Sequence, residues 1–257
     1  MNRLLIAAVV ARVTARIAVK ALESSFARSV GSPHVIACAS GTAAVHAAVA
    51  AIDPEPGDEI ILSRMDHDAN VWPWALMARD RDVIVKWLPF NRDTFEFDLD
   101  DLDELLTERT RLLCVGGASN LTGTLNDVTT ICTKAKAAGV LTYIDGVQSV
   151  PHVVTDVQAT GCDFLVCSPY KFFGPHQGVL WGRRELLEQL EPYKVRPATS
   201  AIPECFETGT QSHEGFAGIK AAVDYLAWIG ESMAGASSGR PALRAAIEML
   251  FAHEKAL

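Results

Sequence analysis

Lys171 and Asp145 each follow an apolar segment, and their side chains could do chemistry together. The segment 163–168 leads into a turn rich in serine and glycine that carries Lys171, and the segment 140–145 ends at Asp145. The carboxyl ends of strands in a parallel α/β sheet face one crevice, so the two side chains can meet there. A lysine at the end of a buried strand is expected to be partly desolvated, which favours the neutral amine that attacks an aldehyde.

This pair of side chains suits pyridoxal 5'-phosphate. Lys171 would hold the aldehyde as a Schiff base, and Asp145 would keep the pyridine nitrogen protonated so that the ring accepts electrons. Each residue also has an ordinary structural interpretation. Lys171 could be a solvated surface lysine, and Asp145 could cap the N-terminus of a helix that follows its strand.

Three further segments place polar residues where such a cofactor could use them. Ser40-Gly41-Thr42-Ala43 opens an alanine-rich helix, so its backbone N–H groups and the helix dipole could hold a phosphate. His67 and Asn120 follow the strand-like segments 59–62 and 111–116. Structural alternatives are open here too, because serine is a common helix N-cap and asparagine readily closes a strand end.

Six short motifs occur in the order and at the spacing of one enzyme family. From about residue 31 to residue 230 the chain resembles the cysteine desulfurase-like branch of the class V aminotransferases, which are fold type I pyridoxal-phosphate enzymes. One such motif is weak, whereas six in order are specific. The motifs are Ser40-Gly-Thr42, Met65-Asp-His-Asp-Ala-Asn70, Ala118-Ser-Asn120, Asp145-Gly-Val-Gln148, Ser168-Pro-Tyr-Lys171 and Phe206-Glu-Thr-Gly-Thr210.

The resemblance implies a role for each matching residue. Lys171, Asp145 and His67 are the expected catalytic residues, with His67 stacked on the cofactor ring and able to transfer protons near neutral pH. Asn120 and Gln148 are expected to hydrogen-bond the phenolic oxygen of the cofactor.

The phosphate is expected to contact a second group of residues, which also holds two departures from the family pattern. Ala43 stands where the family often has a hydroxyl residue, and Tyr170 stands where many relatives have histidine. Tyrosine can donate a hydrogen bond but is uncharged near neutrality. Thr210 is expected to reach the phosphate site of a neighbouring subunit, which implies a homodimer. The expected phosphate ligands are Gly41, Thr42, Ala43, Ser168, Tyr170 and Thr210.

The order of apolar and helical segments predicts an α/β three-layer sandwich with a mainly parallel, seven-stranded sheet. Residues 1–230 are predicted to form the cofactor-binding large domain, with an N-terminal helix over 3–28. Residues 231–257 are predicted to be a linker and the first helix of a small domain, most of which the chain lacks. Strands are expected at 34–38, 59–62, 83–88, 111–116, 140–145, 163–168 and 178–182, and helices at 41–52, 69–80, 98–108, 126–138, 212–230 and 241–256.

The expected function is that of a pyridoxal-phosphate-dependent transferase or lyase whose small-molecule substrate is an amino acid. The expected chemistry is cysteine desulfurase-like or class V aminotransferase-like, and the reaction is open: desulfurization needs a thiol nucleophile, whereas transamination, epimerization or β-elimination needs only the lysine, the electron sink and a base. A cofactor-binding remnant without turnover is a second alternative, because the substrate carboxylate clamp of the family lies in the absent domain. A Rossmann nucleotide module is disfavoured, since no G-x-G-x-x-G turn is present.

Composition narrows the partners and the compartment. The chain has 257 residues and a net charge of −8, with no basic run, so nucleic acid is not an expected partner. The six cysteines lack C-x-x-C spacing and are expected to be core residues in a reducing cytoplasm, without a metal site. Cys205 could carry a persulfide, but an ordinary loop cysteine is favoured. The N-terminal apolar stretch resembles a secretory signal, yet its apolar residues continue at helical spacing, which favours a packing helix and no membrane span.

Overall fold

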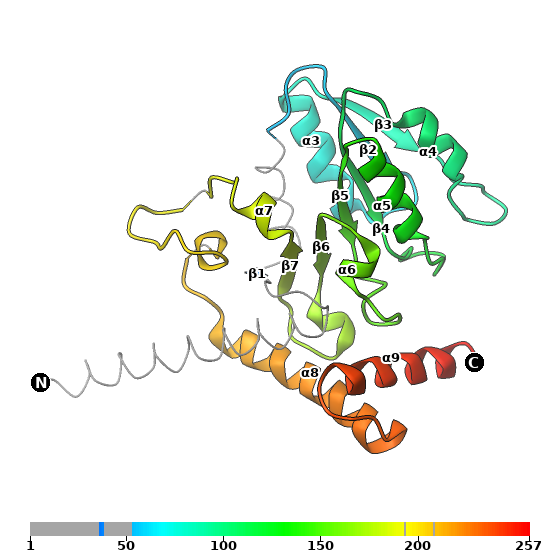
Figure 1. Cartoon of the computed structure of the whole chain (residues 1–257), viewed down its shortest axis with the longest axis vertical. Helices are drawn as coiled ribbons and strands as arrows, with labels where there is room; N and C mark the ends of the chain where they lie inside the picture. The colour runs from blue at the N-terminus through cyan, green and yellow to red at the C-terminus, as the bar shows by residue number, and fades with distance from the viewer. Residues whose placement is uncertain (1–35, 39–52, 193, 208) are drawn as a thin grey trace, which may run out of the picture.

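The computed structural model describes residues 36–38, 53–192, 194–207 and 209–257. Figure 1 shows a central sheet with helices on both faces and a pair of helices, α8 and α9, below it. The predicted helices over 3–28 and 41–52 lie outside the described residues.

The sheet has seven strands in the order β1-β7-β6-β5-β4-β2-β3. β2 to β6 run parallel, whereas β7 is antiparallel to both of its neighbours, β6 and β1. The central strand β4 is buried along nearly its whole length, as expected for a parallel sheet covered on both faces. The strands are β1 (Ile36–Cys38), β2 (Glu59–Ser63), β3 (Ile84–Leu88), β4 (Thr110–Gly116), β5 (Leu141–Asp145), β6 (Phe164–Cys167) and β7 (Gly178–Gly182).

The helices that the sequence predicts between residues 69 and 256 are confirmed, with ends shifted by a few residues. Two helices of four residues, α6 and α7, were not predicted, because one turn is too short to show a helical period. The helices are α3 (Trp72–Asp80), α4 (Leu99–Leu105), α5 (Val128–Ala137), α6 (Val157–Thr160), α7 (Arg184–Leu187), α8 (His213–Ala234) and α9 (Arg240–Glu254), with short 3-10 turns η1 (Asp68–Asn70), η2 (Pro169–Phe172) and η3 (Glu204–Phe206).

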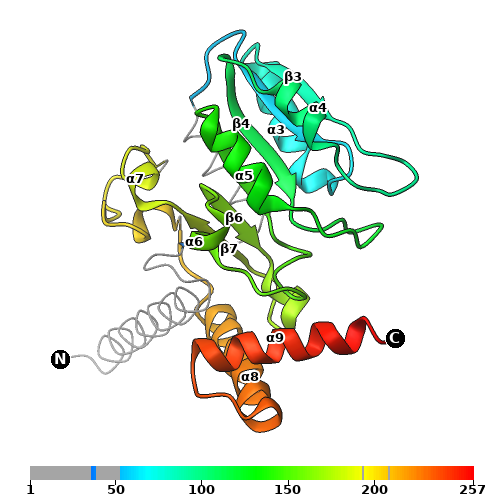
Figure 2. The same ribbon diagram turned by 45° about the vertical axis from the view of Figure 1, so that its right-hand side comes forward.

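Two apolar clusters cover the two faces of the sheet. One joins strand residues to α4, α5, α6, α8 and α9. The other joins the opposite face to α3 and α7, and there the Trp74 ring meets the Tyr143 ring edge-on at 5.2 Å between centroids. Helices therefore enclose the sheet on both sides, as the turned view in Figure 2 also shows, and the predicted three-layer α/β fold is confirmed.

The last helix packs against α8 and shares the core of the sheet through Ala246. Its first turn is tied to the rest of the chain by an ion pair between Arg240 and Asp156, and its last turn by His152 Nδ1 and Glu254 Oε2 at 2.8 Å. α8 continues to Ala234, four residues into the segment 231–257 that was predicted to begin with a linker. The division of the chain into domains at residue 230 stays a prediction.

Gly230 allows α8 and α9 to pack closely. A Cβ atom at this position would stand 1.8 Å from the backbone oxygen of Ala242, which cannot move away without shifting α9. Alanine would gain about 1 kcal/mol of helix propensity over glycine, but the overlap is with backbone atoms and overpacking costs about 1–3 kcal/mol or more. Gly230→Ala is therefore expected to lower the free energy of unfolding, measured by urea denaturation.

The exposed Ser232 on the same helix provides the control for this substitution. Ser232→Ala adds only helix propensity and is expected to leave stability unchanged or slightly raised. An equal or higher stability of Gly230→Ala would show that the α8–α9 contact is looser than described.

Candidate functional site

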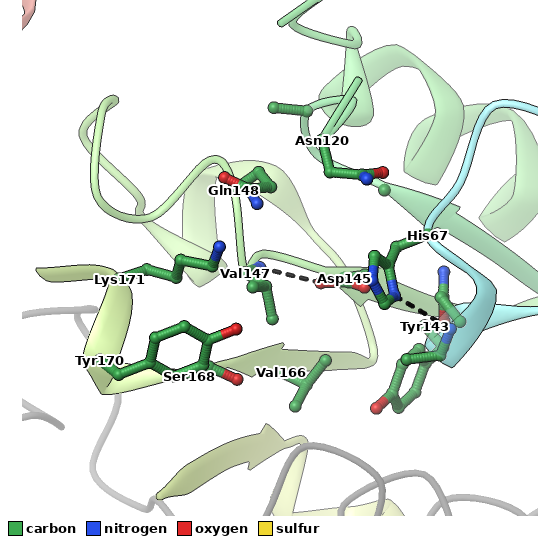
Figure 3. Close-up of a pocket in the computed structure, with 14 residues that line it drawn as sticks. His67, Asn120, Tyr143, Asp145, Val147, Gln148, Val166, Ser168, Tyr170 and Lys171 are labelled. Atoms are coloured by element: carbon green, nitrogen blue, oxygen red, sulfur yellow. Dashed lines mark hydrogen bonds between the residues drawn. The ribbon is translucent and has the colours of Figure 1, made fainter. Parts of the chain in front are cut away.

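A cavity of about 170 Å³ opens where β4, β5 and β6 end. Figure 3 shows side chains from these strand ends and from the turns that follow β2 and β6 pointing into the same space. Seven residues predicted from the sequence line it, and they come from separate parts of the chain: His67, Asn120, Asp145, Gln148, Ser168, Tyr170 and Lys171.

Asp145 is the last residue of β5, and its side chain is largely enclosed. The backbone N–H of Val147 donates to Asp145 Oδ1 over 2.9 Å, which fixes the carboxylate in the turn after the strand. Burial raises the pKa of Asp145, while the Val147 hydrogen bond and the nearby His67 act in the opposite direction. A carboxylate held in such a place is stabilised by any cation that enters the cavity.

Lys171 lies at the rim of the cavity. It belongs to η2, where its backbone N–H donates to the Ser168 oxygen over 3.0 Å, and the turn closes at Phe173 in the left-handed region with φ +69°. The amine lies 5.1 Å from the centre of the Tyr170 ring and points toward Gln148 in Figure 3.

The expected desolvation of Lys171 is not found, because the side chain is exposed. Its turn projects beyond the end of β6, so the described residues leave one side of the amine open to water. The sequence pattern indicated the buried strand correctly but not how far the turn extends past it.

His67 follows β2 and caps the turn η1. Its Nδ1 accepts the backbone N–H of Ala69 over 3.1 Å. A nitrogen that accepts a hydrogen bond carries a lone pair, so the neutral ring holds its proton on Nε2. In Figure 3 the ring lies beside Asp145. His67 thus combines the structural role of a helix cap with a defined tautomer at the cavity.

The loop after β4 carries Asn120 to the cavity. Ser119 Oγ accepts the backbone N–H groups of Leu121 and Thr122, both over 3.3 Å, which shapes the turn. Gly117 sits close against the next strand, since its N–H donates to the Asp145 oxygen over 2.8 Å. A Cβ atom on Gly117 would stand 2.4 Å from the Ser149 hydroxyl oxygen. The close approach of the two strand ends brings the amide groups of Asn120 and Gln148 to one cavity.

Ser168 and Tyr170 flank the lysine turn. Ser168 is buried at the cavity wall, whereas Tyr170 is half exposed and its ring stacks on His176 with 4.7 Å between ring centroids. The tyrosine that stands in place of the family histidine is thus held by a second aromatic ring.

The remaining predicted phosphate ligands are not placed in the cavity. Gly41, Thr42 and Ala43 lie outside the described residues. Thr210 is described but is not among the residues that line the cavity, and its expected action on a neighbouring subunit stays a prediction.

Sequence reasoning missed several residues around the cavity, of which Asp66 is the most notable. Burial raises the pKa of Asp66 to about 7, and the nearby Asp145 contributes to that rise, while hydrogen bonds from Gly116 and Asn70 oppose it. A carboxylate directly after a buried strand was the available signal. The other residues missed at the cavity wall are Ala69, Asn70, Gly116, Ala118, Tyr143, Val147 and Val166.

The cysteines whose side chains are described are free and buried. Burial raises the pKa of the Cys205 thiol, and Cys205 is not among the described residues that line the cavity. Both interpretations of Cys205 stay predictions. No group of side chains suited to a metal ion occurs among the described residues. Within the same residues, no helix is both long enough and apolar enough to cross a membrane.

The fold and the cavity define a class of protein: a mainly parallel α/β sheet that presents a lysine and an aspartate from neighbouring strand ends. The sequence model of the aminotransferase class-V family matches residues 10–249. The chain therefore belongs to the aminotransferase class-V family.

Curated relatives carry a more specific name. The chain is 41% identical over 189 residues to a cysteine desulfurase of Pectobacterium carotovorum subsp. carotovorum, covering 68% of this chain and 46% of the relative. It is 39% identical over 187 residues to a cysteine desulfurase of Yersinia pseudotuberculosis serotype O:1b, with the same shares covered. The chain thus spans about half the length of the curated relatives that it matches.

Solved structures agree with this resemblance. The cysteine desulfurase CsdA from Escherichia coli superposes with a TM-score of 0.77 at 31% identity, covering 83% of this chain and 58% of that chain. A C-DES mutant with glycine covalently linked to its PLP cofactor has a TM-score of 0.76 at 19% identity, covering 84% and 62%. At 19% identity the second structure supports the fold alone.

Proposed function

We propose that the chain binds pyridoxal 5'-phosphate in the cavity at the ends of β4, β5 and β6, and that it serves an enzyme of the cysteine desulfurase type. One observation carries the proposal: the cavity brings the Lys171 amine and the Asp145 carboxylate together from separate strand ends. The named relatives supply the reaction class, since the curated relatives described above are cysteine desulfurases.

The residues present fit the chemistry of the cofactor. A protonated ring nitrogen would offset the cost of burying the Asp145 charge, which is expressed in its raised pKa. The amides of Asn120 and Gln148 offer hydrogen-bond donors to a phenolic oxygen, and Ser168 offers a hydroxyl to a phosphate. When bound, the cofactor supplies an electron sink that stabilises negative charge at the α-carbon of an amino acid.

Each catalytic side chain then has a task that its position allows. Lys171 would hold the cofactor through its amine, and the same nitrogen could take and return a proton. Asp145 would support a positive charge on the ring nitrogen of the cofactor. His67 presents Nε2, the nitrogen that is not engaged by the Ala69 amide, for hydrogen bonding or proton transfer.

The phosphate end of the site and the assembly are part of the same proposal. Gly41, Thr42 and Ala43, with Ser168 and Tyr170, would hold the phosphate, and Thr210 would complete the site of a second copy in a homodimer. The buried free thiols suit a reducing cytoplasm.

A second candidate function follows from the cysteines. Among the described residues none of the cysteines lines the cavity, and desulfurization needs a thiol nucleophile to accept sulfur. This favours, as alternatives, an epimerase or lyase reaction that needs no enzyme thiol, or cofactor binding without turnover.

The test is to add pyridoxal phosphate to the purified chain and record its visible absorbance. A yellow complex is expected, and borohydride reduction followed by peptide mass spectrometry should place the label on Lys171. L-Cysteine should then change the spectrum more than L-alanine and release sulfide. A colourless protein, or a label spread over other lysines, contradicts the proposal, whereas colour without an amino-acid response selects cofactor binding without turnover.

A further inference from the structure

A series of buried and partly buried hydrogen bonds ties the segment after β2 to the end of β4. The indole Nε1–H of Trp74 donates to Asn70 Oδ1 over 3.4 Å, and Asn70 Nδ2–H donates to Asp66 Oδ2 over 2.8 Å. The backbone N–H of Gly116 donates to the other oxygen, Asp66 Oδ1, over 2.9 Å. Trp74 and Asn70 are 0% and 2% exposed, so water does not substitute for these partners.

The donor and acceptor in each of these hydrogen bonds are determined by the two ends of the series, Trp74 and Gly116. An indole N–H and a backbone N–H are donors only. Asn70 must therefore turn its oxygen to Trp74 and its NH₂ group to residue 66. Residue 66 then receives one donor on each of its two terminal atoms, which asparagine cannot accommodate because one of those atoms would be an NH₂ group. The geometry demands a carboxyl group at position 66.

The same series of hydrogen bonds holds the turn that carries His67. His67 caps η1 with its ring and accepts the Asn70 N–H on its backbone oxygen over 2.8 Å. Asp66 anchors this turn from one side and Asn70 from the other. Gly116 precedes the glycine that bonds to the backbone of Asp145, so the anchor joins His67 to the strand ends around Asp145.

We propose that Asp66 is a positioning residue of the site: its two carboxyl oxygens lock the His67 turn onto the end of β4 and so set where the imidazole stands relative to Asp145. The inference deepens the proposed function, on which it rests for what His67 does there. It does not rest on that function for where His67 is held.

Exchanging the carboxyl group of residue 66 with the amide group of residue 70 tests how the His67 turn is anchored, and the test needs no cofactor. In Asp66→Asn, the new NH₂ group of residue 66 faces either the NH₂ group of Asn70 or the N–H of Gly116, so two donors meet. In Asn70→Asp, the carboxyl groups of residues 66 and 70 face each other. Each single variant is expected to be less stable than the parent, with an equilibrium constant for unfolding that is roughly tenfold higher or more. The double variant Asp66→Asn, Asn70→Asp restores the pairs that join Trp74, residue 70, residue 66 and Gly116, since residue 70 then accepts from both Trp74 and residue 66 and the residue 66 oxygen accepts from Gly116.

The double variant should recover most of the stability lost by either single variant in urea unfolding. Asp80 gives the matched control, because it is exposed and paired with the neighbouring exposed Arg79. Asp80→Asn is therefore expected to change the stability little. If a single variant does not fold, recovery of folded protein in the double variant is the supporting result. A double variant no more stable than the worse single variant overturns the proposal.

A second readout reports on His67 itself. Two-bond ¹H–¹⁵N correlation spectra of the imidazoles, with the His67 signals assigned by a His67→Gln variant, should show Nδ1 unprotonated in the parent chain. Asp66→Asn should shift the ring toward a mixture of tautomers, and the double variant should restore the parent pattern. Unchanged His67 signals in a folded Asp66→Asn chain would reduce Asp66 to a stabilising residue and overturn the positioning role.

The outcomes for the cofactor are separable from these. If the parent chain binds pyridoxal phosphate, Asp66→Asn is expected to weaken binding roughly tenfold. If the parent chain fails to bind it, the proposed function fails, while the unfolding and imidazole measurements still decide the role of Asp66.

Discussion

Lys171→Ala is expected to abolish the yellow absorbance that pyridoxal phosphate gives with the parent chain. The visible band depends on a carbon–nitrogen bond between the cofactor and an amine. Among the described residues, Lys171 is the only lysine that lines the cavity. The effect is complete loss of the band, together with complete loss of any amino-acid turnover, because none of the other described residues that line the cavity has an amine that can form the same bond.

The measurement is an absorbance titration with cofactor, repeated for Lys171→Arg and Lys220→Ala. Arginine keeps a positive charge but not the nucleophile, so it should be as colourless as alanine. Lys220 is exposed on α8 and paired with Asp224 at 2.6 Å, and its loss should leave the titration unchanged. A yellow Lys171→Ala complex would mean that another amine holds the cofactor.

Asp145→Asn is expected to separate stability from function. Asparagine keeps an oxygen for the Val147 N–H, so the local hydrogen bond of the turn survives. It removes the buried negative charge that supports a protonated ring nitrogen, and losing such an electrostatic partner costs on the order of 10²–10³-fold in rate. Turnover of L-cysteine, or of whichever amino acid proves to be the substrate, should fall by that amount.

The difference in stability between the parent and Asp145→Asn should depend on pH with a defined sign. The folded chain raises the pKa of Asp145 above its value in the unfolded chain. Between the two values the folded state binds the proton more tightly, so stability falls as pH rises through this window. Without cofactor, Asp145→Asn should therefore be more stable than the parent near pH 8, and this advantage should vanish below the unfolded pKa.

Urea unfolding at several pH values checks this sign, with Asp80→Asn as the surface control. A parent chain that gains stability relative to Asp145→Asn as pH rises would show that the carboxylate has a cationic partner within the chain itself. In that case the argument that the cavity awaits a positive ring nitrogen would lose its support.

Local patterns in the chain predict most of the sheet and the polar residues at its edge. The segments around β4 and β5 are nearly continuous apolar runs, and parallel strands buried on both faces take that form. Because parallel strands all end at one edge, Asp145 and Lys171 could be assigned to a common crevice from their positions alone. The motifs assigned roles to His67, Asn120, Gln148, Ser168 and Tyr170, which line the same cavity.

Other features depend on contacts between residues distant in sequence, which no local pattern contains. One partner of Asp66 is the backbone N–H of Gly116, 50 positions away. A backbone N–H is present at nearly every residue, so the sequence does not indicate this partner. The exposure of Lys171 follows from how far η2 projects beyond β6, although the strand before it is buried as predicted. The strand segments and the polar residues at their ends thus follow from local patterns in the sequence, whereas hydrogen-bond partners and solvent access follow from how the strands pack, because both are properties of neighbours in space.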